Sequence, residues 1–130
     1  MNYFSGVFLF FLYVCYVGAA SISTYSNRYD KIDLQAVIRN DRLLRNYVDC
    51  LLDKVNCRPD GLELKKALPD ALKNECSRCT EAQKKGTTLM LRHLILNRRQ
   101  WWNELEAKYD PKRIYITRYS AQLKKAGVVL

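Results

Sequence analysis

The most reactive side chains in this sequence belong to four cysteines near its middle. Cys50, Cys57, Cys76 and Cys79 are separated by six, eighteen and two residues. In a short chain that begins with an export signal, an even number of cysteines favours disulfides over a metal site or a reactive thiol. Four cysteines allow three pairings, of which neighbour with neighbour needs the shortest loops. Each such loop contributes about 2–3 kcal/mol on the chain-entropy model.

Zinc binding and thiol redox chemistry are the alternatives for these cysteines. A zinc ribbon prefers two closely spaced pairs, whereas six residues separate Cys50 from Cys57. Cys76 and Cys79 have the spacing of a redox motif, but that motif belongs in a βαβ unit, and no strand is predicted here. We therefore expect neither a metal nor a cofactor.

The histidine and the carboxylates do not form a catalytic set. His93 is the only histidine and has no evident partner, so we interpret it as a surface residue and not as a general base. Glu104 and Glu106 stand two positions apart and point to different sides of a helix, which rules them out as an acid–base pair. The sequence also contains no glycine-rich phosphate loop. These observations indicate a protein that is not an enzyme.

The N-terminus has the pattern of a signal peptide. An uncharged apolar run, Val7–Val17, is followed by small residues that end at Ala20. A membrane anchor is the alternative, but a span needs about 20 apolar residues. We expect cleavage near Ala20, so that residues 1–20 are the signal peptide and residues 21–130 form one secreted domain. Cys15 would leave with the signal peptide.

Charge is distributed unevenly along the sequence. The chain has 22 basic and 13 acidic residues and a net charge of +9. Residues 21–83 are nearly neutral, whereas residues 84–130 carry 11 basic and 3 acidic groups, a balance of +8. This excess fits either a solvated helical surface or a surface that docks an anionic membrane or glycan. Nucleic acid is not an expected partner of a secreted protein.

The elements that would position these residues are all helices. Asp33 precedes a short helix, and Asn40 can cap a second one from Asp41 to about Leu52. Residues 59 and 60, Pro and Asp, are typical of a first helical turn. Within that third helix, Pro69 predicts a kink or a restart, because proline removes one backbone hydrogen bond.

The C-terminal half also predicts helices. Thr80 and Gln83 form a capping box at the start of a fourth helix, in which Gly86 is a weak point. A short aromatic helix containing both tryptophans follows and ends before Asp110. The last helix covers about Ile114–Lys125, with Gly127 stopping it. The fold class predicted is all-α, with six helices.

Aromatic residues are numerous for a small helical domain. The chain has nine tyrosines and two tryptophans. These side chains suit the wall of an apolar cavity, because one edge is apolar and the other can form a hydrogen bond. Ordinary core packing explains the same composition, so composition alone does not show a cavity.

Four separated motifs, together with the cysteine spacing, closely resemble the insect chemosensory protein family, also called OS-D-like or pherokine proteins. The motifs are Tyr29–Leu34, Asn40–Leu44, Leu64–Leu72 and Lys108–Pro111. The resemblance covers about residues 25–120 and implies a compact six-helix globule around a hydrophobic channel. It also implies the bridges Cys50–Cys57 and Cys76–Cys79. Members of this family are soluble extracellular carriers of long-chain lipids and semiochemicals, in sensory lymph or haemolymph.

The resemblance also implies which residues line the channel. Its tyrosines fall on Tyr29, Tyr47 and Tyr119, and its tryptophan falls on Trp102. Trp101 is turned away by about 100°, which should place it nearer the surface. Three leucines and Gln83 complete our set, with Gln83 as the polar contact for a ligand head group. The candidate ligand-binding residues are therefore Tyr29, Leu43, Tyr47, Leu64, Leu68, Gln83, Trp102 and Tyr119.

The expected function is reversible binding of a small hydrophobic ligand by a secreted monomer, with a membrane surface or a receptor as the point of delivery. One departure from the family is the basic segment 112–113, which could favour ligands that carry a carboxylate. The alternative is a secreted interaction or developmental factor that docks an anionic membrane or glycan and transports nothing. A membrane-disrupting defence peptide fits less well, because the apolar stripes are committed to one core.

Overall fold

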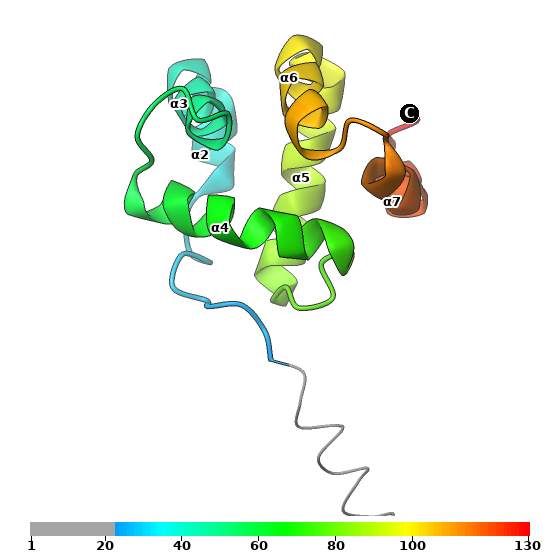
Figure 1. Cartoon of the computed structure of the whole chain (residues 1–130), viewed down its shortest axis with the longest axis horizontal. Coiled ribbons are helices and arrows are strands. Elements are labelled where there is room, and N and C mark those ends of the chain that lie inside the picture. The colour runs from blue at the N-terminus through cyan, green and yellow to red at the C-terminus, as the bar shows by residue number, and fades with distance from the viewer. Residues whose placement is uncertain (1–22) are drawn as a thin grey trace, which may run out of the picture.

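The computed structural model describes residues 23–130, which form six helices and no strand (Figure 1). The helices are α2 (Leu34–Arg39), α3 (Asp41–Leu51), α4 (Pro59–Lys73), α5 (Glu81–Asn97), α6 (Arg99–Tyr109) and α7 (Ile114–Lys125). The predicted all-α, six-helix fold is confirmed. The expected signal peptide, its cleavage near Ala20 and Cys15 lie outside the described residues. Among residues 23–130, no helix is both long enough and apolar enough to span a membrane.

Side-chain caps define where three of the helices begin. The carboxylate of Asp33 and the amide oxygen of Asn40 each accept a hydrogen bond from the backbone three residues on, at the starts of α2 and α3. Thr80 and Gln83 form both hydrogen bonds of the predicted capping box at the start of α5. Each such cap is worth about 0.5–2 kcal/mol. All three helix starts were predicted correctly.

α4 continues through Pro69, which corrects the expectation of a restart there and leaves the alternative, a kink, as a prediction. Pro69 is exposed, as its neighbour Asp70 is. Water can therefore reach the backbone carbonyl that loses its helical partner, which lowers the cost of a proline inside a helix.

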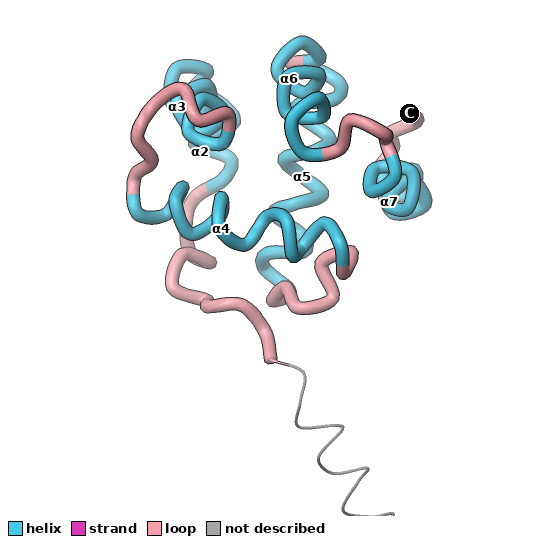
Figure 2. The backbone as a smooth tube through the Cα atoms, in the orientation of Figure 1, coloured by secondary structure: helices cyan, strands magenta, loops and turns pink. Residues whose placement is uncertain are grey.

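The core is built by every helix except α4. Its buried apolar side chains come from α2, α3, α5, α6, α7 and the C-terminal segment, and they are Val37, Leu44, Val48, Leu94, Ile95, Trp102, Leu105, Ile116, Leu123 and Val128. Burying one such side chain contributes about 1.5–3 kcal/mol. The only buried residue of α4 is Gly61. In Figure 2, α4 crosses from the side of α2 and α3 toward α5, with a loop at each end.

Gly86 has a packing role that the sequence did not indicate. A Cβ atom at this position would come within 2.6 Å of Leu34 Cδ1. The missing side chain therefore lets α2 approach α5 closely. The expected weak point of α5 is a contact point between two helices.

Two disulfides close the corners on either side of α4. Cys50 at the end of α3 pairs with Cys57, and Cys76 pairs with Cys79 in the turn between α4 and α5. Both pairings are those implied by the family resemblance. Since all four sulfur atoms are in disulfides, none is available as a thiolate ligand for zinc.

Candidate functional site

Four of the predicted ligand-binding residues meet at the core. Trp102 of α6 is one of its buried members, and Leu43, Tyr47 and Tyr119 are partly buried and pack against it. These four side chains come from α3, α6 and α7. The structure thus gathers two tyrosines, a tryptophan and a leucine around one apolar interior.

The two adjacent tryptophans have different surroundings, as expected. Trp102 is 8% exposed, and its indole N–H has no hydrogen-bond partner among residues 23–130. A buried donor without a partner costs about 1–3 kcal/mol, so an acceptor that reached it would be stabilised. Trp101 is half-buried, with the guanidinium groups of Arg45 and Arg98 at 5.4 and 5.5 Å from its ring centroid.

Tyr47 fastens the first turn of α4 to α3. Its hydroxyl donates a hydrogen bond to the carboxylate of Asp60. Burial, followed by this carboxylate, raises the pKa of Tyr47 to about 12. Close by, a Cβ atom added to Gly61 would lie 3.0 Å from Cys50 Sγ. The N-terminal end of α4 is therefore held by a disulfide, a hydrogen bond and a close backbone contact.

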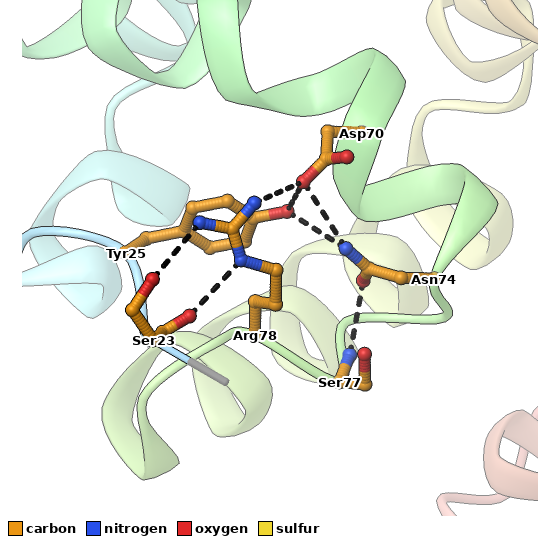
Figure 3. Close-up of polar contacts among 6 residues, drawn as sticks. All are labelled: Ser23, Tyr25, Asp70, Asn74, Ser77 and Arg78. Carbon is orange, nitrogen blue, oxygen red and sulfur yellow. Dashed lines mark hydrogen bonds and ion pairs between the residues drawn. The ribbon is translucent and has the colours of Figure 1, made fainter. Parts of the chain in front are cut away.

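A polar cluster fastens the other end of α4 to the N-terminal segment (Figure 3). The Tyr25 hydroxyl donates to Asp70 and accepts from the Asn74 amide at 3.0 Å. Arg78 donates to Asp70 at 3.1 Å and to the Ser23 carbonyl at 3.0 Å, and its guanidinium lies 5.0 Å from the Tyr25 ring centroid. Burial and the Asp70 hydrogen bond raise the pKa of Tyr25.

Between Gly61 and the C-terminal end of α4, no side chain of this helix is buried. Leu68, Ala71 and Leu72 are half-buried, and none of them is fully buried. Regions with few buried apolar contacts open at lower free-energy cost than the core. The middle of α4 is therefore expected to move more easily than the helices that build the core.

The remaining predicted residues do not join the core cluster. Tyr29 and Leu68 are half-buried. Leu64 is 46% exposed although Leu68 lies one turn on along the same face of α4, so its expected place in the lining stays a prediction.

Gln83 is half-buried, and its amide is already engaged. Its oxygen accepts from the Thr80 backbone N–H at 3.1 Å, and its nitrogen donates to Asp30 at 3.0 Å and to the Ser26 carbonyl at 2.9 Å. Both amide hydrogens are used in this way. The Gln83 side chain already caps α5 and binds the N-terminal segment. A ligand head group would have to compete with these hydrogen bonds for the same amide.

His93 is less exposed than expected. It is half-buried, and its Nε2 atom is enclosed without a hydrogen-bond partner in the described part of the chain. Burial, with a smaller effect from Arg98, lowers the pKa of His93. Its other ring nitrogen lies 3.4 Å from the Asn97 side-chain nitrogen, which is not an acid–base partner.

The two best-defined hollows of residues 23–130 are open grooves at the surface. One lies along the loop after α3 and includes Asn56 and Leu62. The other has a volume of about 610 Å³ and is lined by residues of α5, of α7 and of the turn after α4. Neither groove includes Trp102, which lies among the buried side chains of the core.

The second groove contains residues that the sequence analysis missed. Of the predicted set it includes only Tyr119, together with Lys85, Thr88, Leu89 and Arg92 from α5. A signal for them was present, since positions 85, 88 and 92 follow the i, i+3, i+7 spacing of one helix face. What the sequence could not show is that α7 lies beside this face.

Comparison with known sequences identifies relatives over most of this chain. The family model described as "Insect pheromone-binding family, A10/OS-D" matches residues 25–117. Allergen Tha p 1 of Thaumetopoea pityocampa is 54% identical over 101 residues, which are 78% of this chain and 80% of the allergen. Ejaculatory bulb-specific protein 3 of Drosophila melanogaster is 47% identical over 109 residues, 84% of this chain and 86% of that protein.

Solved structures include similar folds with substantial sequence identity. A chemosensory protein in complex with bromo-dodecanol superposes with a TM-score of 0.72 at 42% identity, over 76% of this chain and 99% of that one. Antennal chemosensory protein A6 from the moth Mamestra brassicae gives a TM-score of 0.64 at 43% identity, over 76% of this chain and 97% of that one.

Proposed function

This chain belongs to the insect pheromone-binding family A10/OS-D, and on that premise we propose that it is a carrier of small hydrophobic ligands. The family and the similar structures are those of binding proteins, so the expectation that the chain is not an enzyme is confirmed. The ligand class proposed is a long alkyl chain with one polar end. A relative of known structure binds such a molecule, bromo-dodecanol.

The observation that carries this proposal is the environment of Trp102. Its indole N–H is buried without a partner, among apolar side chains of several helices. A hydroxyl or carbonyl oxygen on the ligand would accept a hydrogen bond from it, while the alkyl chain replaced apolar contacts. Each buried methylene contributes about 0.8 kcal/mol, so a chain of about a dozen carbons offsets the cost of association and gives micromolar affinity.

The proposed route for the ligand passes beneath α4. This helix is fastened at both ends, through Cys50–Cys57 and Tyr47 at one end and through the Tyr25 cluster at the other. Its middle contributes no buried side chain to the core. We infer that the middle of α4 lifts while its ends stay in place, and that Leu68 then packs against the bound chain.

The proposed location is outside the cell. An apolar N-terminal run that ends at Ala20 supports secretion and removal of residues 1–20, and the two disulfides suit an oxidising compartment. We propose that residues 21–130 act as a monomer, with a membrane surface or receptor as the site of delivery.

The test is a calorimetric titration of 1-dodecanol into the wild-type protein and matched tryptophan variants. Trp102→Phe keeps an aromatic ring and removes the N–H, so we expect affinity to fall about 2- to 10-fold. Trp101→Phe is the control, because Trp101 is only half-buried at the edge of the core and lies beside two arginines, and the affinity of this variant should be unchanged. Trp102→Ala should weaken binding further, provided that circular dichroism shows it still folds.

Equal effects of the two Phe variants would overturn the assignment of Trp102. Salt provides the second arm of this experiment, because apolar binding persists at high ionic strength and docking to an anionic surface does not. Failure of 1-dodecanol to bind, with salt-sensitive attachment to anionic vesicles, would favour the alternative function of a surface-docking factor.

A further inference from the structure

The groove between α5 and α7 is large enough to hold a small molecule. Its volume of about 610 Å³ lies within the range of about 300–1,000 Å³ that is usual for ligand pockets. Leu89 and the ring of Tyr119 give it apolar surface, and Thr88 adds a hydroxyl. The C-terminal end of α4 leads directly into it, since Glu75 and Cys76 also belong to its lining.

Positive charge dominates the rim of this groove. Lys84, Lys85 and Arg92 line it, against the single carboxylate of Glu75. Lys84 is paired with Glu81 at 3.4 Å.

Two of these cations remain available for an incoming anion. Lys85 and Arg92 are exposed, and neither takes part in an ion pair among residues 23–130. They lie seven positions apart on one face of α5, which points both toward the same groove.

Tyr119 connects the groove with the apolar interior. It lines the groove and is also one of the partly buried side chains that pack against the core. An alkyl chain whose polar end rested among the cations could therefore pass Tyr119 and continue toward the core.

We propose that this groove binds the carboxylate end of a long-chain fatty-acid anion and makes the protein prefer carboxylates to alcohols of the same length. The inference rests on the proposed carrier function and names the ligand class that the carrier takes. Lys85 and Arg92 bind the carboxylate by charge-assisted hydrogen bonds, and Leu89 and Tyr119 contact the first methylenes. Because the groove is open to water, this preference weakens as salt is added.

The experiment compares dodecanoate with 1-dodecanol by calorimetry, at low and high salt, on three forms of residues 21–130. The test variant is Lys85→Gln/Arg92→Gln. The control is Arg42→Gln/Lys66→Gln, which removes the same charge at two exposed positions outside the groove. Surface substitutions of this kind rarely change stability by more than about 0.5 kcal/mol, so all three forms should fold.

The wild-type protein should bind dodecanoate more tightly than 1-dodecanol, with a difference that shrinks at high salt. In the test variant, dodecanoate affinity should fall about 3- to 10-fold while 1-dodecanol affinity stays unchanged. The control variant should retain the wild-type preference. Amide NMR signals of Thr88 and Gln122, both in the groove, should shift with dodecanoate in the wild-type protein.

An unchanged dodecanoate affinity in the test variant, or an equal loss in the control, would overturn the inference while leaving 1-dodecanol binding and the carrier function intact. If neither ligand binds any form, the carrier function itself fails. Phosphatidylserine vesicles form the last arm: if they, and not dodecanoate, depend on Lys85 and Arg92, these cations serve a membrane surface and the fatty-acid site is refuted.

Discussion

Single polar atoms on aromatic rings determine much of how this protein works. The Tyr47 hydroxyl binds a carboxylate at the start of α4, whereas the Trp102 N–H has no partner in the described chain. The first atom joins α3 to the start of α4. The second is a buried donor without an acceptor among residues 23–130. Two aromatic side chains of one interior therefore differ in whether their polar atom is already paired.

The pKa of Tyr47 gives a prediction at this scale. An unfolded tyrosine has a pKa of about 10, and in the folded protein that of Tyr47 is raised to about 12. Burial of the protonated hydroxyl, together with its hydrogen bond to Asp60, therefore favours the folded protein below about pH 10, and this contribution is lost as the pH rises from about 10 to about 12. The free energy of unfolding should fall more steeply over that interval in the wild-type protein than in Tyr47→Phe.

Tyrosinate absorbance provides the direct check. The difference between the alkaline titrations of the wild-type protein and Tyr47→Phe should show one tyrosine with a midpoint near 12. A difference curve centred near 10 would mean that the hydroxyl is not held by Asp60 in solution.

Residue-level prediction from the sequence succeeded where helical phase decides the outcome. The angle between adjacent positions placed Trp102 inside and Trp101 nearer the surface, and the structure has Trp102 buried and Trp101 half-buried. The exposure of Leu64 could not be predicted in this way, because the apolar stripe of α4 is wider than the contact it makes. Periodicity identifies the apolar side of a helix, but not how much of that side a neighbour covers.

At the scale of helices, close approach at a glycine can be tested. Replacing glycine by alanine inside a helix usually gains about 1 kcal/mol. In Gly86→Ala the new methyl group would meet Leu34 Cδ1, so we expect that gain to be lost in the wild-type background. In the Leu34→Ala background the obstacle is absent, and the same change should stabilise by about 1 kcal/mol.

Urea denaturation of the wild-type protein, Gly86→Ala, Leu34→Ala and the double variant measures the coupling free energy between positions 34 and 86. A coupling near zero would show that Leu34 turns aside at no cost, and that Gly86 is not required for packing of α2 on α5.

Helix boundaries were the most predictable feature of the fold. A helix cap is a local interaction that is complete within four residues, so the sequence alone predicts the starts of the helices capped by Asp33, Asn40 and Thr80. Burial of Ile116 and Val128 was not predicted, because it depends on how α7 and the C-terminal segment return to the core. The cost of Pro69 inside α4 depends on whether water can bind the backbone carbonyl four residues earlier, which loses its helical hydrogen bond. The sequence does not show whether that carbonyl is exposed.

For the whole molecule, the two disulfides make separate contributions to stability. They link residues seven and three positions apart. On the chain-entropy model such loops contribute about 2.5 and about 2 kcal/mol. Cys50→Ala/Cys57→Ala should therefore lower the free energy of unfolding slightly more than Cys76→Ala/Cys79→Ala, and removal of both bridges should cost about 4 kcal/mol.

Chemical denaturation of these variants tests the ranking, with circular dichroism to show that the helices persist. A clearly larger loss of unfolding free energy on removing Cys76–Cys79 than on removing Cys50–Cys57 would contradict this ranking. It would show that the Cys76–Cys79 bridge stabilises the native turn after α4 in addition to closing a loop.

The separation between α4 and the core also has an evolutionary consequence. Stability depends on side chains of the other five helices and the C-terminal segment, together with the fastened ends of α4. Substitutions along the middle of α4 therefore cost little stability, and most proteins have only a few kcal/mol to lose. Mutation can thus reshape the surface that a ligand would meet while the scaffold stays intact. A lineage that duplicates such a gene can diversify what its copies bind without first acquiring compensating changes in the core.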